Sequence, residues 1–531
     1  MVEWLCKRFL TGLCTLVLGL AAATDGVRAE GTLRIVMSSD LKIVDPVWSS
    51  IQLSRTHGYL VYDTLFSLDS DLKPQPQMVE RYTVSPDKLE YTFVLRDGLA
   101  WHDGTPVTAA DCVASLDRWA PRDTMGQKLR ANTQELVAVD ARTIRLTLAR
   151  PYAFVLESLA KPGGVVPFMM PERLARTPGN QQITEVVGSG PFKFRADEWK
   201  PGEKTVYLRN KSYKPRAEPA SNFAGGKVAK LARIEWIAIP DPQTAVNALL
   251  AGEVDALELV STDLLPLVER DKSISIVRSA LPNQFNLRPN WLHPPFDNAK
   301  VREALGYALN QDDFVAAAIG DPRFSRPCKA YFVCGTELAS DAGVQDRLQG
   351  DVVKAKALLK EAGYNGEPIV LLHATDVSAI ANLAPVAKAQ LERVGFKVDM
   401  QSMDWQTQIS RFVRRDPPSQ RGWNLVTASW GALDVMNPVV SAFLNASCEK
   451  ATGGWPCDPV MEEMRERFAR ESDPAKRKAV AAEIQVRAVT AGMYFPLGEW
   501  FNLGAYSNKI RGNLATPSAT VFWSMEKVAP P

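Results

Sequence analysis

The order of apolar and polar residues predicts strands and helices that alternate along most of the chain. Residues 91–95 place bulky apolar side chains at every second position, a period of two that indicates a strand with one buried face. Thr108 stands three residues before Asp111, a capping-box pattern that predicts the start of a helix running through Trp119. The chain here changes from a strand pattern to a helix pattern.

The same alternation continues in the second half of the chain. Helices are predicted at 242–251, 352–362 and 377–394, and they stop at Gly252, Gly363 and Gly395. Strands are predicted at 256–259, 368–374, 396–400 and 423–429. Such alternation favours an α/β protein with mixed, mainly parallel sheets flanked by helices. Ligands bind such sheets at the carboxyl ends of the strands.

His102 and Asp103 lie between the first strand and helix described above. An adjacent His and Asp followed by Thr105 suggests either a catalytic site or a structural turn. Asp-Gly pairs tolerate the positive φ that tight turns need, and one stands on each side of His102, at 97–98 and 103–104. We therefore interpret both residues as turn residues.

Length and charge limit the function classes. A chain of 531 residues is too long for one core, so two or three domains are expected. The formal net charge is +2, from 62 basic and 60 acidic residues, and the basic residues are scattered. This balance gives no sign of nucleic-acid binding.

The N-terminus predicts export. Lys7 and Arg8 precede an apolar run at 9–23, and small residues follow near 27–29, as in a secretory signal peptide spanning 1–29. The alternative, a transmembrane helix, needs about 20 apolar residues, and the run at 9–23 is shorter than that. No cysteine follows the predicted cleavage position, so we expect a free periplasmic protein without a lipid anchor.

The remaining cysteines fit an oxidising compartment. Cys328 with Cys334 and Cys448 with Cys457 would each close a short loop, so we predict two disulfides and a free Cys112. Zinc binding is the alternative, but the spacings are wrong for paired zinc knuckles and no His accompanies them. We predict no metal and no cofactor.

Motifs for catalysis are missing from the sequence. Ser-x-x-Lys occurs three times, at 39–42, 85–88 and 447–450, without the Ser-Asp-Asn or Lys-Thr-Gly partners of penicillin-binding proteins. No Gly-x-Ser-x-Gly, Walker loop or His-Glu-x-x-His occurs. We expect a protein that is not an enzyme.

Four segments in order along the chain resemble landmarks of one family. "LRDGLAWHDGTPVTAADCVASLDRW", "GSGPFKF", "LRNKSYKP" and "PPFDNAKVREALGYALNQDDF" are similar to segments of the family 5 extracellular solute-binding proteins, the peptide-, nickel- and oligosaccharide-binding components of ABC importers. The resemblance implies a two-lobed clamp of the type II periplasmic-binding-protein class with an extra inserted subdomain.

The resemblance also implies domain boundaries. Lobe I would comprise 30–68, 186–283 and 497–531, the inserted subdomain 69–185, and lobe II 284–496. The chain would pass between the lobes near "NQFNLRP" and "MYFPLGEW". Two such crossings form a hinge that closes on a ligand.

The resemblance points to Asp434 as the main ligand-binding residue. Peptide-binding members carry an aspartate four residues before a proline, where it pairs with the α-ammonium of the peptide, and Asp434 matches this position relative to Pro438. The acidic residue usual just before the proline is Asn437 in this chain. A turn-capping role for Asp434 is the alternative.

The other predicted ligand-binding residues follow strands or lie at the first crossing. They are Ser39, Asp40, Asn283, Gln284, Phe285, Trp405, Trp430 and Gly431. Dipeptide-binding members hold the ligand carboxylate with an arginine in the stretch that resembles "HATDVSA", where this chain has none. Strict dipeptide specificity is therefore not expected.

Together these features predict a monomeric receptor that delivers a peptide or amine-bearing peptide-like solute to inner-membrane ABC permease subunits and their ATPases. Within the family, the alternatives are a nickel chelate, a sugar or another organic solute. A periplasmic chaperone or a signalling receptor on the same clamp is the alternative from another class.

Overall fold

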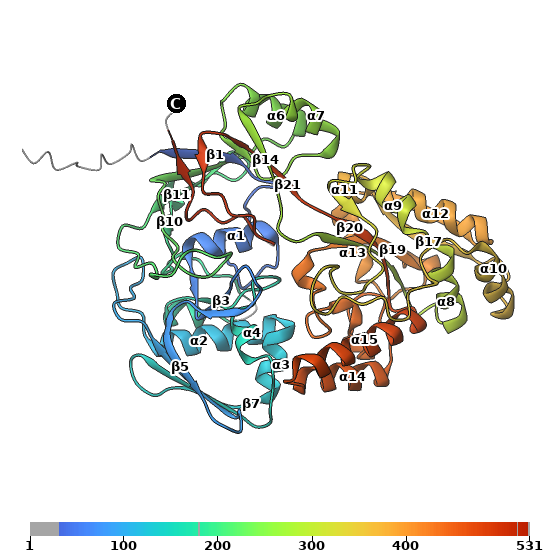
Figure 1. Ribbon diagram of the computed structural model, residues 1–531, viewed down its shortest axis with the longest axis horizontal. Coiled ribbons are helices and arrows are strands. Elements are labelled where there is room, and N and C mark those ends of the chain that lie inside the picture. Colours follow the sequence, from blue (N-terminus) through green and yellow to red (C-terminus); the bar gives the residue numbers. More distant parts are fainter. Residues whose placement is uncertain (1–30, 179–180, 518, 529–531) are drawn as a thin grey trace, which may run out of the picture.

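The computed structural model describes residues 31–178, 181–517 and 519–528, so the predicted signal peptide lies outside the described residues. Figure 1 shows two lobes joined by strands that pass between them. Within the described ranges, no helix combines the length and the apolar character needed to cross a membrane.

A seven-stranded sheet forms the centre of the first lobe. Its strand order is β10-β11-β12-β1-β13-β21-β14, with β1 Thr32–Val36, β10 Phe192–Phe194, β11 Lys204–Arg209, β12 Arg233–Ile237, β13 Ala256–Leu257, β14 Ile274–Arg278 and β21 Leu503–Ser507. The helices of this part are α1 Gln52–Val61, α6 Pro242–Leu250 and α7 Leu265–Glu269. The sheet therefore combines the two ends of the chain with its middle.

A four-stranded antiparallel sheet is inserted into this lobe. Its order is β5-β6-β8-β7, with β5 Val79–Val84, β6 Glu90–Leu95, β7 Thr133–Ala138 and β8 Thr143–Leu148. Helices α2 Ala109–Trp119, α3 Thr124–Asn132, α4 Val155–Leu159 and α5 Glu172–Ala175 accompany it. Short pairs complete the lobe, namely β2 Asp63–Thr64 with β9 Phe168–Met169, β3 Phe66–Leu68 with β4 Pro74–Pro76, and β22 Ile510–Arg511 with β23 Glu526–Lys527.

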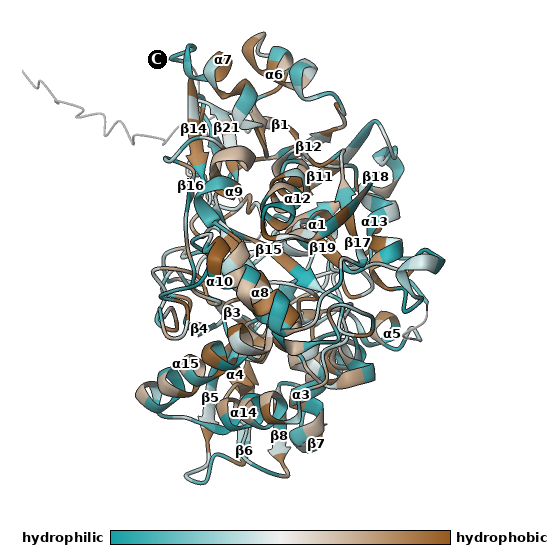
Figure 2. Cartoon of the chain, turned by 90° about the vertical axis from the view of Figure 1, so that its right-hand side faces the viewer, coloured by the Kyte–Doolittle hydropathy of each residue, from teal (hydrophilic) through white to brown (hydrophobic). Residues whose placement is uncertain are grey.

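The second lobe is built on a six-stranded sheet. Its order is β16-β20-β15-β19-β17-β18, with β15 Asn283–Pro289, β16 Ser325–Arg326, β17 Pro368–Ala374, β18 Lys397–Met403, β19 Leu425–Trp430 and β20 Phe495–Trp500. Its helices are α8 Ala299–Ala308, α9 Gln311–Ala318, α10 Val352–Glu361, α11 Ser378–Ala381, α12 Leu383–Val394, α13 Trp405–Phe412, α14 Pro459–Arg470 and α15 Pro474–Ala491. Hydrophilic and hydrophobic residues share α8 and α12 (Figure 2), as expected for helices that bury one side.

Strand directions differ from the sequence prediction in one respect. The two large sheets are mixed, but among the described strands parallel pairing is confined to β1 with β12 and β13 and to β17 with β18 and β19. The prediction of mainly parallel sheets was therefore wrong. The strands that lead into the passages between the lobes pair antiparallel with their neighbours. The alternation of helices and strands along the chain does not reveal this direction.

The local predictions agree closely with the elements. Side chains of Thr108 and Asp111 form a reciprocal capping box at the start of α2. Gly395 ends α12 with φ 110°, a left-handed conformation that glycine adopts without strain. The single helix predicted at 377–394 is divided into α11 and α12 at Asn382.

The chain passes twice between the two large sheets. One passage joins β14 to β15 and the other joins β20 to β21. The Ser279 N–H donates to the Asn502 carbonyl at 2.9 Å, and Asn283 Nδ2 donates to Asn502 Oδ1 at 3.0 Å. The two passages therefore lie side by side as a two-stranded connection.

A second contact joins the lobes away from these passages. Phe154 stacks on Phe468 of α14 with ring centroids 5.4 Å apart, and the Ala153 N–H donates to the Ala469 carbonyl at 3.0 Å. Ion pairs Lys128–Glu466 and Glu157–Arg477 flank the stack. The inserted sheet region and the α14–α15 hairpin thus belong to one continuous apolar core, and they lie in the lower part of Figure 1.

The turn around His102 has a structural explanation. His102 Nε2 lies 3.0 Å from the Gly190 carbonyl oxygen, and burial lowers the pKa of the imidazole to about 4, so the ring is neutral at pH 7. Asp103 accepts hydrogen bonds from the N–H and hydroxyl of Thr105 and pairs with Arg173. The side chains hold the turn together.

Replacing His102 with Gln is expected to lower the free energy of unfolding by about 1 kcal/mol, because a half-buried hydrogen bond and ring packing are lost. Ligand affinity should stay unchanged, because His102 does not line the cavity described below. Thermal unfolding and calorimetry on the same variant test this. A loss of affinity at unchanged stability would contradict the structural assignment.

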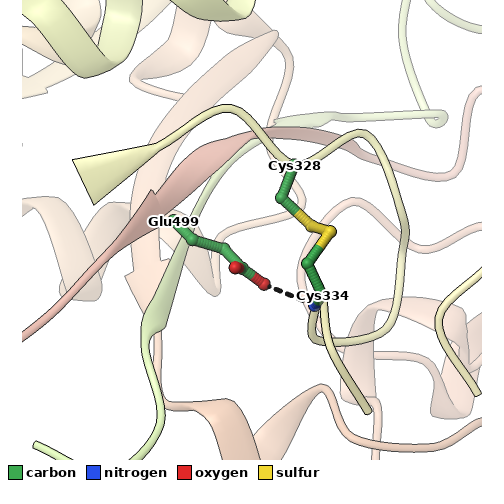
Figure 3. Close-up of side chains that lie close together, drawn as sticks. All are labelled: Cys328, Cys334 and Glu499. Carbon is green, nitrogen blue, oxygen red and sulfur yellow. Dashed lines mark hydrogen bonds between the residues drawn. A yellow bond between two sulfur atoms is a disulfide. The ribbon is translucent and has the colours of Figure 1, made fainter. Parts of the chain in front are cut away.

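The structure joins Cys328 to Cys334 and Cys448 to Cys457 through disulfides, and Cys112 is buried and free. The loop between Cys328 and Cys334 contacts both strands that lead into the passages. Glu499 on β20 accepts the Cys334 N–H at 2.8 Å (Figure 3), and Gln284 on β15 donates to the carbonyls of Ala330 and Tyr331. This disulfide therefore lies beside the connection between the lobes.

Candidate functional site

A cavity of about 450 Å³ lies where the lobes meet. It is lined by the start of α1, the ends of β1 and β13, the passages between the lobes, the loop after β19 and the segment before β23. A volume of this size suits a small molecule or a short peptide. The carboxyl ends of β1 and β13 face it, as expected for a site at the edge of a sheet.

Four of the nine predicted ligand-binding residues line this cavity. They are Asn283, Trp430, Gly431 and Asp434. The first lies at the start of β15 and the others at the end of β19 and in the turn that follows. The structure thus brings together residues that are about 150 positions apart.

Ser39 and Asp40 lie just outside the cavity. Asp40 Oδ2 accepts the Gly202 N–H at 2.8 Å, which turns the carboxylate towards the loop before β11. Ser38 lines the cavity instead, and its N–H donates to Glu258 Oε2 at 2.9 Å. The segment after β1 was identified, but the residue that faces the cavity is Ser38.

Gln284, Phe285 and Trp405 also lie away from the cavity. Gln284 is buried against the disulfide loop, and Phe285 stacks on Trp500 with centroids 5.6 Å apart. Trp405 begins α13 and packs on the apolar core of the second lobe. Phe285 therefore supports a cavity wall, because Trp500 lines the cavity.

Asp434 is the acidic residue that the second lobe contributes to the cavity. Burial between the lobes raises the pKa of its carboxyl above the ordinary value of 3.8, and Arg55 and Lys161 oppose this effect. Lys161 is itself paired with Asp123. A cation placed beside Asp434 would favour the ionised form of its carboxyl.

Gly431 leaves space next to this carboxylate. A Cβ atom added at Gly431 would lie 3.1 Å from Asp434 Oδ2 and 3.8 Å from Asn283 Oδ1. Two oxygen acceptors from different segments thus lie on the side where Gly431 has no side chain, at the cavity wall. An ammonium group has three donors and can donate to more than one acceptor from within the cavity.

Aromatic side chains form the neighbouring wall. Trp430 meets Phe443 edge to face at 5.0 Å, and Trp500 Nε1 donates to Ser429 Oγ at 2.8 Å. Both indoles line the cavity and are held in place by these contacts. They offer apolar surface beside the acceptors at Asp434.

Sequence reasoning missed Arg55, Glu258 and Arg278, which also line the cavity. Glu258 accepts hydrogen bonds from the Ser38 N–H, Gln52 Nε2 and Thr520 Oγ1, and so joins β13 to three other segments. Glu258 lies inside the strand predicted at 256–259, so no local pattern indicated that its side chain faces a cavity. Arg55 lies inside a helix and Arg278 at the end of a strand, where charged residues are common.

One close cluster of potential metal ligands occurs among the described residues. It consists of Cys328, Cys334 and Glu499 (Figure 3). The two sulfur atoms are bonded to each other and so offer no thiolate, the form of cysteine that binds metals. The cluster lies beside the passages between the lobes, and its role in the structure is the contact of Glu499 with the disulfide loop.

Two lobes, a two-stranded connection and a polar cavity between them define a ligand-binding clamp. Residues 73–452 match the family model described as bacterial extracellular solute-binding proteins, family 5. The protein belongs to this family.

Related proteins agree in length and architecture. The chain is 38% identical over 520 residues, covering 97% of both chains, to a protein of Sinorhizobium fredii (strain NBRC 101917 / NGR234) named probable peptide ABC transporter periplasmic-binding protein. It is 30% identical over 399 residues, 74% of both chains, to the glutathione-binding protein GsiB of Escherichia coli (strain K12).

Solved structures share the fold at lower identity. The Helicobacter pylori binding protein DppA in complex with peptide STSA superposes with a TM-score of 0.79 at 23% identity, covering 95% of this chain and 99% of that chain. The protein MoaA of A. tumefacien R10 in complex with mannopinic acid gives a TM-score of 0.78 at 22% identity, covering 94% and 100%. At these identities the likeness concerns the fold.

Proposed function

We propose that the protein is a periplasmic receptor that captures a peptide or amine-bearing peptide-like solute and delivers it to an ABC permease and its ATPases. The solute binds in the cavity between the lobes, which move about the two-stranded connection. The boundaries expected for this motion are lobe I at 30–68, 186–283 and 497–531, with the insertion at 69–185, and lobe II at 284–496. The protein acts as a monomer that leaves the cytoplasm by means of the signal peptide at 1–29 and carries no lipid anchor.

The observation that carries the proposal is the pair of oxygen acceptors beside Gly431. Asp434 Oδ2 and Asn283 Oδ1 both lie on the side where Gly431 has no side chain, at the cavity wall, and the carboxylate is partly buried. An anionic group is repelled by the carboxylate and a neutral hydroxyl donates a single uncharged hydrogen bond, whereas an ammonium group has three donors and makes charge-assisted hydrogen bonds. The names of the relatives from Sinorhizobium fredii and Escherichia coli support the same class of solute.

Native mass spectrometry of freshly purified protein tests this function, because a solute bound during expression adds its own mass. We expect a peptide or another compound with a primary amine. Isolation of a sugar or of a solute without an amine would contradict the proposal. The disulfides Cys328–Cys334 and Cys448–Cys457 should be present in the same sample, as expected in the periplasm.

Affinity for an amine ligand is expected to fall as the pH is lowered through the pKa of Asp434, at a pH above 3.8. Binding needs the ionised carboxylate, whereas burial favours the protonated form, so protons compete with the ligand. The free energy of unfolding of the ligand-free protein depends on pH in the opposite direction. Protonation of Asp434 contributes stability there, and this stability is lost as the pH rises.

Calorimetric titrations between pH 4 and pH 7 with the co-purified solute measure this effect. The Asp434→Asn variant is the control, since its residual affinity should not depend on pH in this range. Equal affinities of the natural protein across the range would show that Asp434 does not take part.

A further inference from the structure

Among the described residues, four charged side chains line the cavity: Arg55, Glu258, Arg278 and Asp434. Glu258 is occupied by three hydrogen bonds from neighbouring segments. Arg55 is 8% exposed and lies close enough to Asp434 to affect the pKa of its carboxyl. Arg278 differs from these three because it is exposed and ends β14, where the passage between the lobes begins.

The guanidinium of Arg278 is held in one place. Its central carbon lies 4.2 Å from the ring centroid of Phe501, in the other passage. Nη1 makes one long contact of 3.5 Å to the Arg323 carbonyl oxygen. Contact with an aromatic ring fixes the side chain and leaves donors at the edge of the guanidinium for another partner.

Neighbouring arginines have acidic partners, whereas Arg278 makes no ion pair within the described part of the chain. Arg323 pairs with Asp321 and Glu269, and Arg326 pairs with Glu499. Arg278 therefore brings a charge without an ion-pair partner to the cavity wall. A guanidinium in this setting matches a carboxylate, which it binds with two parallel hydrogen bonds.

We propose that Arg278 binds a carboxylate of the solute, so that the cavity selects ligands with an ammonium at the Asp434 end and a carboxylate at the Arg278 end. This inference rests on the proposed function, because it assumes a ligand at Asp434. It specifies a second charged group on the ligand, a carboxylate, and the direction in which the ligand lies in the cavity.

A series of hydrogen bonds links the segment of Arg278 to Asn283, another residue that lines the same cavity. Arg278 precedes Ser279, whose N–H donates to the Asn502 carbonyl, and Asn502 Oδ1 accepts from Asn283 Nδ2. Asn283 Oδ1 and Asp434 Oδ2 both lie beside Gly431. Arg278 and Asp434 line one cavity, so a single ligand that fills it would meet both.

Randomised tripeptides serve as the probe, in one pool with free carboxyl termini and one pool of the corresponding C-terminal amides. Native mass spectrometry of the natural protein should show binding of the acid pool and about ten- to a hundredfold weaker binding of the amide pool, the range for one charge-assisted interaction. Arg278→Gln should reduce affinity for the acid pool by the same factor and leave the amide pool unchanged. Arg278→Lys keeps the charge but loses the planar guanidinium, so its affinity for the acid pool should fall between that of the natural protein and that of Arg278→Gln.

Arg122→Gln is the matched control. Arg122 is an exposed arginine placed over the Trp48 ring at 4.9 Å, outside the cavity, and its replacement should change neither affinity. Unfolding temperatures of the variants verify that they are folded. Equal binding of both pools to the natural protein, or an equal loss for both pools in Arg278→Gln, would overturn the role of Arg278 and leave the proposed function standing. Binding of neither pool would overturn both.

Discussion

Replacing Asp434 with Asn is expected to weaken binding of an amine ligand by about a hundredfold to several thousandfold. The substitution keeps the shape of the side chain and removes its charge, so the ammonium is left at a partly buried position without its counter-ion. Breaking one side of a buried ion pair costs about 3–5 kcal/mol, and 1.4 kcal/mol corresponds to a factor of ten. No other predicted variant has so large an effect.

Asp40→Asn provides the control for this experiment. Asp40 is another aspartate that the sequence assigned to the cleft, yet its carboxylate accepts the Gly202 N–H outside the cavity. Calorimetry with the co-purified solute should therefore show unchanged affinity for Asp40→Asn. An unchanged affinity in Asp434→Asn would instead falsify the amine-anchor role and favour sugars or other neutral solutes.

Gly431→Ala is expected to weaken the same ligand by about ten- to a hundredfold. The added methyl would lie 3.1 Å from Asp434 Oδ2 and 3.8 Å from Asn283 Oδ1, and so would crowd the approach of the proposed ammonium to these acceptors. The loss corresponds to one hydrogen bond to a charged group. Gly431 has φ −66° and ψ 150°, which alanine adopts readily, so the backbone should not be strained.

Gly163→Ala adds the same methyl on the other side of the carboxylate. Its Cβ would lie 3.4 Å from Asp434 Oδ1, and Gly163 does not line the cavity. Dissociation constants of both variants, measured with the solute and with its N-acetylated form, separate the two positions. If Gly431→Ala weakened both forms equally, the methyl would act on the cavity as a whole and not on an ammonium site.

The fold was predictable because its local signals are strong. The buried residues Ala355 and Leu359 of α10 recur at helical spacing, β17 is a short apolar run, and the capping box at Thr108 and Asp111 fixes the start of α2. Strand direction was not predictable in the same way. Whether β15 pairs antiparallel with β19 and β20 depends on how the chain returns from the other lobe, which no local pattern records.

The candidate site was predictable where a single segment determines it. Trp430, Gly431 and Asp434 lie within five residues at the end of one strand, so one correctly placed strand brings all three to the cavity. At β15 only Asn283 faces the cavity, because both sides of this strand are covered and Gln284 and Phe285 pack against other segments.

The other differences between the predicted residues and the residues that line the cavity also arise from contacts between distant segments. After β1, the turn decides whether Ser38 or Ser39 faces the cavity, and the distant Glu258 holds Ser38 there. Arg55 and Arg278 became candidates only when α1 and β14 were seen to reach the same cavity. Contacts between segments far apart in the sequence determine these positions.

The contact between Phe154 and Phe468 bears on the lobe motion proposed above. If the lobes open as proposed, these rings separate and expose side chains that are 3% and 0% accessible, so the contact favours the closed form independently of the ligand. Affinity measured in solution equals the intrinsic affinity of the closed form multiplied by the fraction of molecules that occupy it before binding. Natural variation at α14 or at residues 153–157 can therefore adjust how much solute the receptor retains at a given external concentration, while the chemistry of recognition stays the same.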